Sequence, residues 1–292
     1  MVGPTLTVGG SRVYLLVMLR SALPIVLFLL AGTPAPLGAQ ALRLDLTAAN
    51  RHLWRGINRT TGWVGQIDLS TVAPLGPGGL AVGVFESREL SRAGAGDLTE
   101  VGLGRKGLGE RDWWLEYRTP VGSQEIFAGL TRYTFHGNRQ LGGRSSGDNT
   151  TEISLGAQSK LTYLSPALAL HWDVEKVGGM YLEASGALPL LGWPFPPPVN
   201  VYLDAALGLS FGQGPDAAHP DQLAYYAGDG FTHVATGLSV DLRQGEHFTT
   251  GIGARVQAGI DDEAHRGSTG RRRNLFVSCW VGTTLRLGRL PR

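Results

Sequence analysis

The sequence predicts an all-β chain, an antiparallel transmembrane β-barrel of about twelve strands. Past residue 40, apolar and polar side chains alternate along one segment after another, and no apolar run is long enough to cross a membrane as a helix. In the segment 112–118, Trp113, Leu115 and Tyr117 share one face, while the charged residues share the other face with Trp114. Alternate side chains of a strand point to opposite faces, so each such segment offers one face to lipid and one to water. The 43 glycines and the charged fraction of 17% suit a β-barrel wall better than a helical protein.

The first 39 residues are typical of a secretory signal peptide. Arg12 and Arg20 precede the short apolar run 23–31, and Ala39-Gln40-Ala41 offers small residues for cleavage after Ala39 or Ala41. The alternative is a buried helix of a soluble protein. We therefore expect export through the Sec pathway and a single barrel domain over residues 40–292.

Period-2 runs separated by turn residues give the predicted strands. Ten or fourteen strands are alternatives, because 103–106 and 222–226 could pair as further strands. The twelve predicted strands are 41–54, 63–73, 79–89, 111–120, 124–135, 150–160, 166–175, 180–189, 199–211, 231–242, 246–259 and 273–287.

The connections alternate between short turns and long polar loops. The loops 90–110, 136–149, 212–230 and 260–272 fall on one side, whereas most turns on the other side are tight. Short turns on one side and long loops on the other are typical of a barrel in the bacterial outer membrane. An even strand count then places both barrel termini on the short-turn, periplasmic side.

Aromatic residues and the single cysteine fit the same interpretation. Trp and Tyr are enriched at the level of the lipid headgroups. We therefore expect a belt near the long loops, made of Trp54, Trp63, Trp113, Tyr133 and Trp172. Cys279 has no partner for an intramolecular disulfide, and it is tolerable if it faces lipid or packs against a neighbour.

Several stretches resemble the TorF family of porins, Gram-negative outer-membrane proteins. The strongest likeness is the aromatic-Arg-Gly-Ile turn 53–58, followed by the Gln/Asp strand 66–70 and the glycine-aromatic strand 83–87. Further likenesses are 132–135 and 151–156. The resemblance implies a barrel with passive transport. One departure is that such barrels usually end on an aromatic residue, whereas this chain ends Leu290-Pro291-Arg292.

If the apolar faces meet lipid, the opposite faces line the lumen. A hydrated lumen with opposing charges selects ions or small polar solutes; the alternative is a lumen filled by paired charges. Acids modestly outnumber bases among the candidates, which predicts a weak preference for cations. The pore-lining candidates are Arg43, Asp45, Asp68, Asp112, Glu116, Arg118, Glu152, Lys160, His171, Asp173, Glu175, Glu183, Asp204, Asp241, Arg243, Arg255 and Arg286.

The long-loop side carries basic residues that fit a phosphorylated surface. Arg271, Arg272 and Arg273 open the last predicted strand, and arginine binds phosphate in bidentate fashion. We expect them to contact lipopolysaccharide; the alternative is a solvated basic turn. Other expected partners are outer-membrane lipids, small solutes and, during biogenesis, the barrel-assembly machinery. A formal charge of +2 gives no argument for nucleic acid.

Catalytic and metal motifs are weak. His233 and Ser239 lie about 20 Å apart along one strand, too far to act together. His171 shares a face with Asp173, and Ser154 or Ser210 could approach from another strand, but no Gly-x-Ser-x-Gly motif occurs. The histidines are scattered without metal-ligand spacing, so we expect neither a metal nor another cofactor.

The sequence therefore favours a passive outer-membrane channel over two alternatives. The first alternative is a non-conducting barrel with a structural or adhesive role through its loops. The second is a barrel enzyme that acts on lipids.

Overall fold

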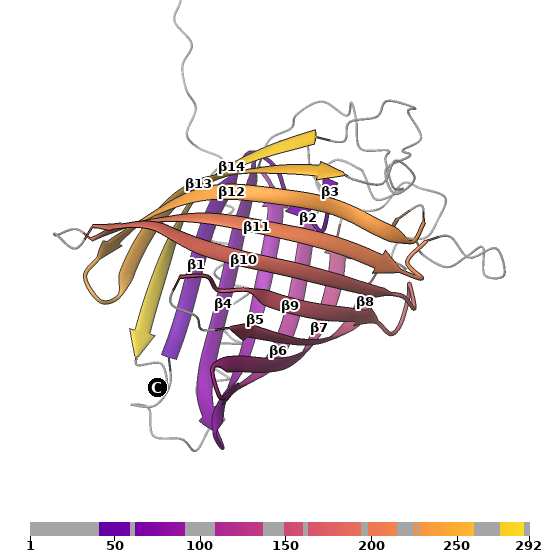
Figure 1. Cartoon of the computed structure of the whole chain (residues 1–292), viewed down its shortest axis with the longest axis horizontal. Helices are drawn as coiled ribbons and strands as arrows, with labels where there is room; N and C mark the ends of the chain where they lie inside the picture. The colour runs from indigo at the N-terminus through magenta and orange to yellow at the C-terminus, as the bar shows by residue number, and fades with distance from the viewer. Residues whose placement is uncertain are drawn as a thin grey trace, which may run out of the picture.

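Twelve antiparallel strands close into a barrel in the computed structural model (Figure 1). This confirms the predicted fold class and strand number. Within the described ranges, no helix is long and apolar enough to cross a lipid bilayer. The structure describes residues 41–58, 62–90, 109–136, 149–159, 163–193, 198–214, 225–226, 228–259 and 275–288.

The wall follows chain order, and a two-stranded sheet is separate from it. That small sheet consists of β2 (Leu53–Trp54) and β3 (Ile57–Asn58). The wall strands are β1 (Ala41–Ala49), β4 (Val64–Leu75), β5 (Gly78–Glu89), β6 (Gly109–Val121), β7 (Gln124–His136), β8 (Thr150–Ser159), β9 (Ala167–Asp173), β10 (Met180–Trp193), β11 (Val199–Phe211), β12 (Gly230–Gln244), β13 (Phe248–Gly259) and β14 (Leu275–Gly288).

The first wall strand closes the barrel by pairing with two partners. Ala41 of β1 lies opposite Gly288 of β14 and also opposite Val72 of β4. Every wall strand therefore has two neighbours, so the sheet has no edge with unpaired backbone groups, as a spanning sheet in lipid requires. Both ends of the wall lie at the end of the barrel where the short turns gather (Figure 1).

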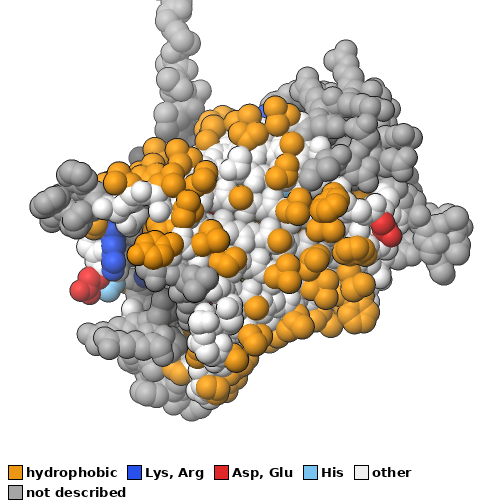
Figure 2. Space-filling model, viewed as in Figure 1, with side chains coloured by type: hydrophobic (Ala, Val, Ile, Leu, Met, Phe, Trp, Pro, Cys, Tyr) orange, Lys and Arg blue, Asp and Glu red, His pale blue; other side chains and the backbone are white. Residues whose placement is uncertain are grey.

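The outer face of the wall is apolar. Leu115, Ile153 and Leu155 are 43%, 44% and 56% exposed, although each is strongly hydrophobic. Hydrophobic side chains spread over the outer wall, and the charged side chains in view lie near the two ends (Figure 2). An exposed apolar surface of this extent is stable against lipid rather than water.

The inner face carries the polar residues that alternate with this belt. The Cα register places Asp112, Glu152 and Asp173 on the face opposite Leu115 and Ile153, and all three are buried. Trp114 shares this inner face, where a Cβ on Gly83 would lie 2.5 Å from its ring. The tryptophan that broke the alternation therefore packs inside the barrel over a residue that has no side chain.

Two predictions about the first and fifth strands are corrected. The first strand was expected to reach residue 54, but β1 ends at Ala49 and the chain turns inward to form β2 and β3. Trp54 and Tyr133 were expected in the interfacial belt. Their rings instead make an edge contact inside the barrel, at 6.0 Å between centroids. The polar contacts described below draw them inward.

The other belt aromatics and the cysteine lie on the outer face. Trp63 and Trp172 are 51% and 49% exposed, and Trp113 shares its face with Leu115. Cys279 is exposed and lies opposite Ala254, between the exposed residues Val277 and Val281. The thiol therefore faces outward from the barrel, the first of the two alternatives.

Candidate functional site

The connection between β1 and β4 folds into the barrel through a tight hairpin. Arg55 and Gly56 form its two-residue turn with φ angles of 47° and 88°. Two consecutive positive φ angles are typical of a type I′ turn, whose twist matches paired strands. A Cβ on Gly56 would lie 3.0 Å from the Cβ of His233 on the wall, so only glycine fits this turn without displacement.

Arg55, at the tip of this hairpin, forms a buried ion pair with the wall. Its Nη1 and Nη2 atoms donate to Oε1 and Oε2 of Glu152 at 2.6 and 2.8 Å. The Tyr133 hydroxyl donates to the same carboxylate at 2.9 Å. Burial alone would lower the pKa of Arg55, but the Glu152 carboxylate outweighs it and holds that pKa above its ordinary value. The guanidinium therefore stays charged.

Aromatic rings surround the guanidinium. It lies 4.6 Å from the Trp54 ring centroid and 4.7 Å from that of Tyr181 on β10. Trp54 also makes an edge contact with Tyr225, at 5.1 Å between centroids. Cation–π contacts strengthen when the cation is shielded from water, so these rings help to fix the hairpin tip.

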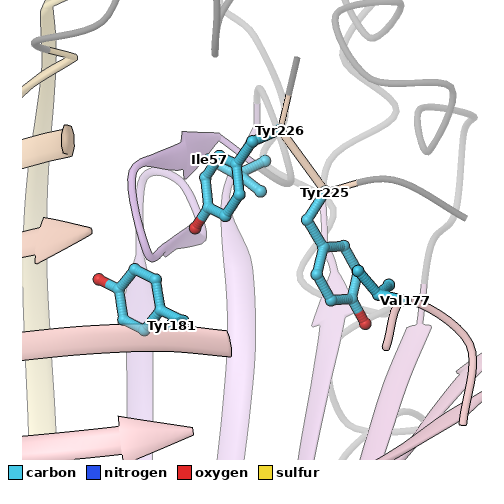
Figure 3. Packing of buried hydrophobic residues seen from close by; sticks show 5 residues of the cluster. All are labelled: Ile57, Val177, Tyr181, Tyr225 and Tyr226. Carbon is cyan, nitrogen blue, oxygen red and sulfur yellow. The ribbon is translucent and has the colours of Figure 1, made fainter. Parts of the chain in front are cut away.

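A second segment, Tyr225 and Tyr226 between β11 and β12, packs against the hairpin. The Tyr226 hydroxyl donates to the backbone oxygen of Arg55 at 2.8 Å. Both tyrosines form a buried cluster with Ile57, Val177 and Tyr181 (Figure 3). We call residues 53–58 together with Tyr225 and Tyr226 the plug. It lies inside the barrel near the long-loop end, where it contacts the inward residues Glu152 and Tyr181.

Asp173, at the end of β9, organises the wall beside the plug. Its Oδ1 atom accepts the backbone N–H groups of Glu175, Lys176 and Val177 at 2.9–3.0 Å. Its Oδ2 atom accepts hydrogen bonds from Thr150 at 2.7 Å and from the Tyr225 hydroxyl at 3.5 Å. A carboxylate that accepts several N–H bonds shapes a tight connection, and this one carries Val177 to the plug.

Most of the candidates for the lumen share the inward face of the wall. Strand register shows this, because each lies opposite other inward residues across two neighbouring strands. The candidates on the inward face are Arg43, Asp45, Asp68, Asp112, Glu116, Arg118, Glu152, His171, Asp173, Glu183, Asp204, Asp241, Arg243, Arg255 and Arg286.

The short-turn end of the interior holds a cavity. This cavity of about 710 Å³, which we call the vestibule, is lined by residues that include Arg43, Trp114, Glu116, Arg118 and Arg286. Arg118 pairs with Glu116 at 2.5 Å and with Glu125 at 3.1 Å, also on the lining. The vestibule is thus polar, charged and large enough for several waters or a small solute.

The structure does not place three sets of predicted residues on the inward face. Glu175 is not on the inward face, because β9 ends at Asp173 and Glu175 pairs with Arg132, whose register partner Trp113 faces outward. Lys160 and the arginines 271–273 lie outside the described residues.

Sequence reasoning missed the plug. The sequence reading places Trp54 at the end of a wall strand and Arg55-Gly56 in the turn after it. Glycine permits the positive φ of a two-residue hairpin turn, but Arg-Gly is not one of the Asn-Gly, Asp-Gly or Gly-Gly pairs that mark it, so the signal is weak. The partner Glu152, 97 residues away, could not have been found from spacing.

The arrangement of serine and histidine gives little support to a hydrolase. Ser154 lies directly opposite His171 across β8 and β9, but no hydrogen bond joins their side chains in the described structure. The His171 ring instead lies 6.1 Å from that of Tyr181. Among the residues that the structure describes, no group of three His, Cys, Asp or Glu side chains is placed to hold a metal ion.

The comparisons with known proteins find the fold alone. No family model and no curated sequence matches the chain. Similar solved structures include the KdgM porin, with TM-score 0.47 and 10% identity over 83% of this chain and 98% of that one. LpxR from Salmonella typhimurium has TM-score 0.49 and 9% identity, over 83% of this chain and 99% of that one. An outer membrane channel from Pseudomonas putida F1 has TM-score 0.45 and 8% identity, over 87% of this chain and 97% of that one.

Proposed function

We propose that the chain forms a channel in the bacterial outer membrane for passive diffusion of ions or small polar solutes, and that the plug keeps it closed until the hairpin moves. The observation that carries this proposal is the row of charged side chains along the inward face. A charged vestibule opens at the short-turn end, and charged side chains follow the inward face as far as the Arg55–Glu152 pair.

The plug supports a gate rather than a permanent filling. Its hairpin joins the wall through a side-chain ion pair and ring contacts, and β2 and β3 pair only with each other. Such contacts can break together without disturbing a wall strand. Lid opening and local unfolding occur on microsecond to second timescales, and release of such a hairpin would fall in this range.

The plug also gives the non-conducting alternative a specific basis. If the Arg55–Glu152 pair never breaks and the plug blocks the lumen, the barrel does not conduct, and its role would lie in its loops as a structural or adhesive protein. A buried pair with side-chain exposures of 8% and 1% is costly to separate, which favours rare opening.

Single-channel recording tests the proposal. The protein, purified from membranes of a Gram-negative host, would be inserted into a planar bilayer. We expect discrete current steps separated by long closed periods, with no turnover of added phospholipid. A barrel that is folded by its heat-modifiable gel migration and stays silent would support the loop-based role. Release of fatty acids would support the lipid enzyme instead.

A further inference from the structure

Two clusters of charged side chains lie on the outward face of the wall, where lipid-facing residues are expected. In the first, Glu86 of β5 accepts from Arg88 Nε at 2.5 Å and from Arg111 Nη2 of β6 at 2.9 Å. The register pairs Glu86 with Arg111, and the neighbouring pair on the same face is Val84 with Trp113. This cluster therefore shares its face with the apolar belt.

The second cluster continues the first across the next strands. Arg132 of β7 lies opposite the outward Trp113 and opposite Thr151 of β8. Its Nη1 atom donates to Thr151 Oγ1 at 2.7 Å and pairs with Glu175. We call the two clusters together the charged strip: Glu86, Arg88, Arg111, Arg132, Thr151 and Glu175.

The apolar belt begins directly beside the strip. Along each strand the next outward position is two residues away, and these positions hold Leu130 next to Arg132 and Ile153 next to Thr151. Both are more than two-fifths exposed. The strip thus marks the level at which the wall passes from acyl chains to lipid headgroups, on the side of the long loops.

The strip has spare capacity to bind an anion. Its three guanidinium groups outnumber its two carboxylates, which leaves one net positive charge. The side chains of Arg88, Arg111 and Arg132 are 37%, 26% and 41% exposed. Each guanidinium has five N–H donors, and the contacts within the strip use only one or two of them. The remaining donors suit a phosphate, which arginine binds at two points.

We propose that the charged strip binds the phosphate groups of lipopolysaccharide in the outer leaflet, with the acyl chains against Leu115, Leu130 and Ile153. The site rests on the proposed outer-membrane location but not on conduction. It adds a phosphorylated lipid as a ligand of the wall between β5 and β9. Two features fix this occupant: the donors lie at headgroup level, and the apolar belt next to them continues into the bilayer.

Lipid binding by the detergent-purified protein tests this site. Native mass spectrometry would follow the titration of lipopolysaccharide, its dephosphorylated form and phosphatidylglycerol. We expect the combined variant Arg88→Gln, Arg111→Gln, Arg132→Gln to bind lipopolysaccharide at least about tenfold more weakly than the wild type, since hydrogen bonds to charged groups are lost. Dephosphorylation should weaken wild-type binding by a similar factor.

A second variant separates binding from a structural role. Glu86→Gln with Glu175→Gln removes the competing carboxylates, so it should bind lipopolysaccharide at least as tightly as the wild type. If the strip only stabilised the wall, both variants would lose stability and neither would change affinity. Arg243→Gln, at the short-turn end, is the matched control and should bind normally.

Two results would overturn the site. One is equal lipopolysaccharide binding by the wild type and the triple arginine variant, and the other is full competition by phosphatidylglycerol at equal concentration. Single-channel recording keeps this outcome apart from the channel proposal, because the triple variant should conduct like the wild type. A silent barrel that binds lipopolysaccharide through the strip would overturn the channel and leave the site standing.

Discussion

The Arg55 guanidinium meets both carboxylate oxygens of Glu152 inside the barrel, although 97 residues separate them in the chain. This pair joins an inward-folded loop to β8. In the proposed channel, it is the contact on which opening of the barrel depends most directly.

The first prediction concerns this pair. Arg55→Ala leaves the Glu152 charge buried without its cation, and breaking one partner of a buried pair costs about 3–5 kcal/mol. We expect the ratio of open to closed time in single-channel records to rise by at least about a hundredfold, because 1.4 kcal/mol corresponds to a factor of ten. Arg243→Ala is the control. Unchanged records in Arg55→Ala would show that the pair does not hold the gate.

The second prediction concerns the turn of the hairpin. Gly56→Ala places a Cβ at a φ of 88° and 3.0 Å from His233 on the wall. We expect a loss of about 1–2 kcal/mol in the stability of the closed plug, from the left-handed backbone and the close contact. Frequent short openings in planar-bilayer records would reveal it.

Gly245→Ala provides the matched control for the turn. Gly245 has a similar φ of 74°, but nothing lies within 4 Å of an added Cβ and the residue is in a short turn at the other end. This variant should lose stability from its left-handed backbone conformation without affecting the plug. Equal gating in both variants would mean that the Gly56 turn has no specific role.

The third prediction concerns ion selectivity in the opened barrel. In the Arg55→Ala background, reversal potentials in a salt gradient should favour cations weakly, because acids exceed bases on the inward face. Adding Glu116→Gln removes a vestibule carboxylate and frees Arg118 from its 2.5 Å ion pair. The potential should then move toward anion preference. A clear anion preference before this change would contradict the selectivity argument.

The fourth prediction concerns the outer face around Cys279. The thiol is exposed and lies among apolar residues of β14. A bimane fluorophore attached to it in reconstituted vesicles should be quenched strongly by lipids with brominated acyl chains and weakly by aqueous iodide. The opposite order would mean that this wall does not face lipid.

A control for the labelling keeps the fold constant. Cys279→Ser should insert normally and take up no label, because Cys279 is the only cysteine in the chain. Residual fluorescence after labelling of that variant would show that the signal does not come from the thiol.

Local alternation was enough to predict the wall. The segment 112–118 shows why: in a strand, each residue's face depends only on its position, so the apolar row of Leu115 and the polar row of Glu116 can be assigned without knowing any partner. Strand number followed from the same rhythm, and all twelve wall strands overlap the predicted ranges.

The inward position of the plug could only be decided by tertiary structure. Trp54 has the same aromatic character as Trp63, yet one ring packs inside against Tyr133 and the other lies on the outer face. Their difference depends on where the chain leaves β1 and on what the closed wall presents across the lumen. Glu152 and Tyr226 meet Arg55 from 97 and 171 residues away.

The sequence by itself determined the strands, their faces and the polar character of the interior, because these depend on the two-residue period of the backbone. Only the tertiary structure decided that the hairpin folds inward to meet Glu152, and that Arg132 and Glu175 join the outer surface. Barrel closure brings distant residues together, and their contacts depend on register and curvature, which no local pattern encodes.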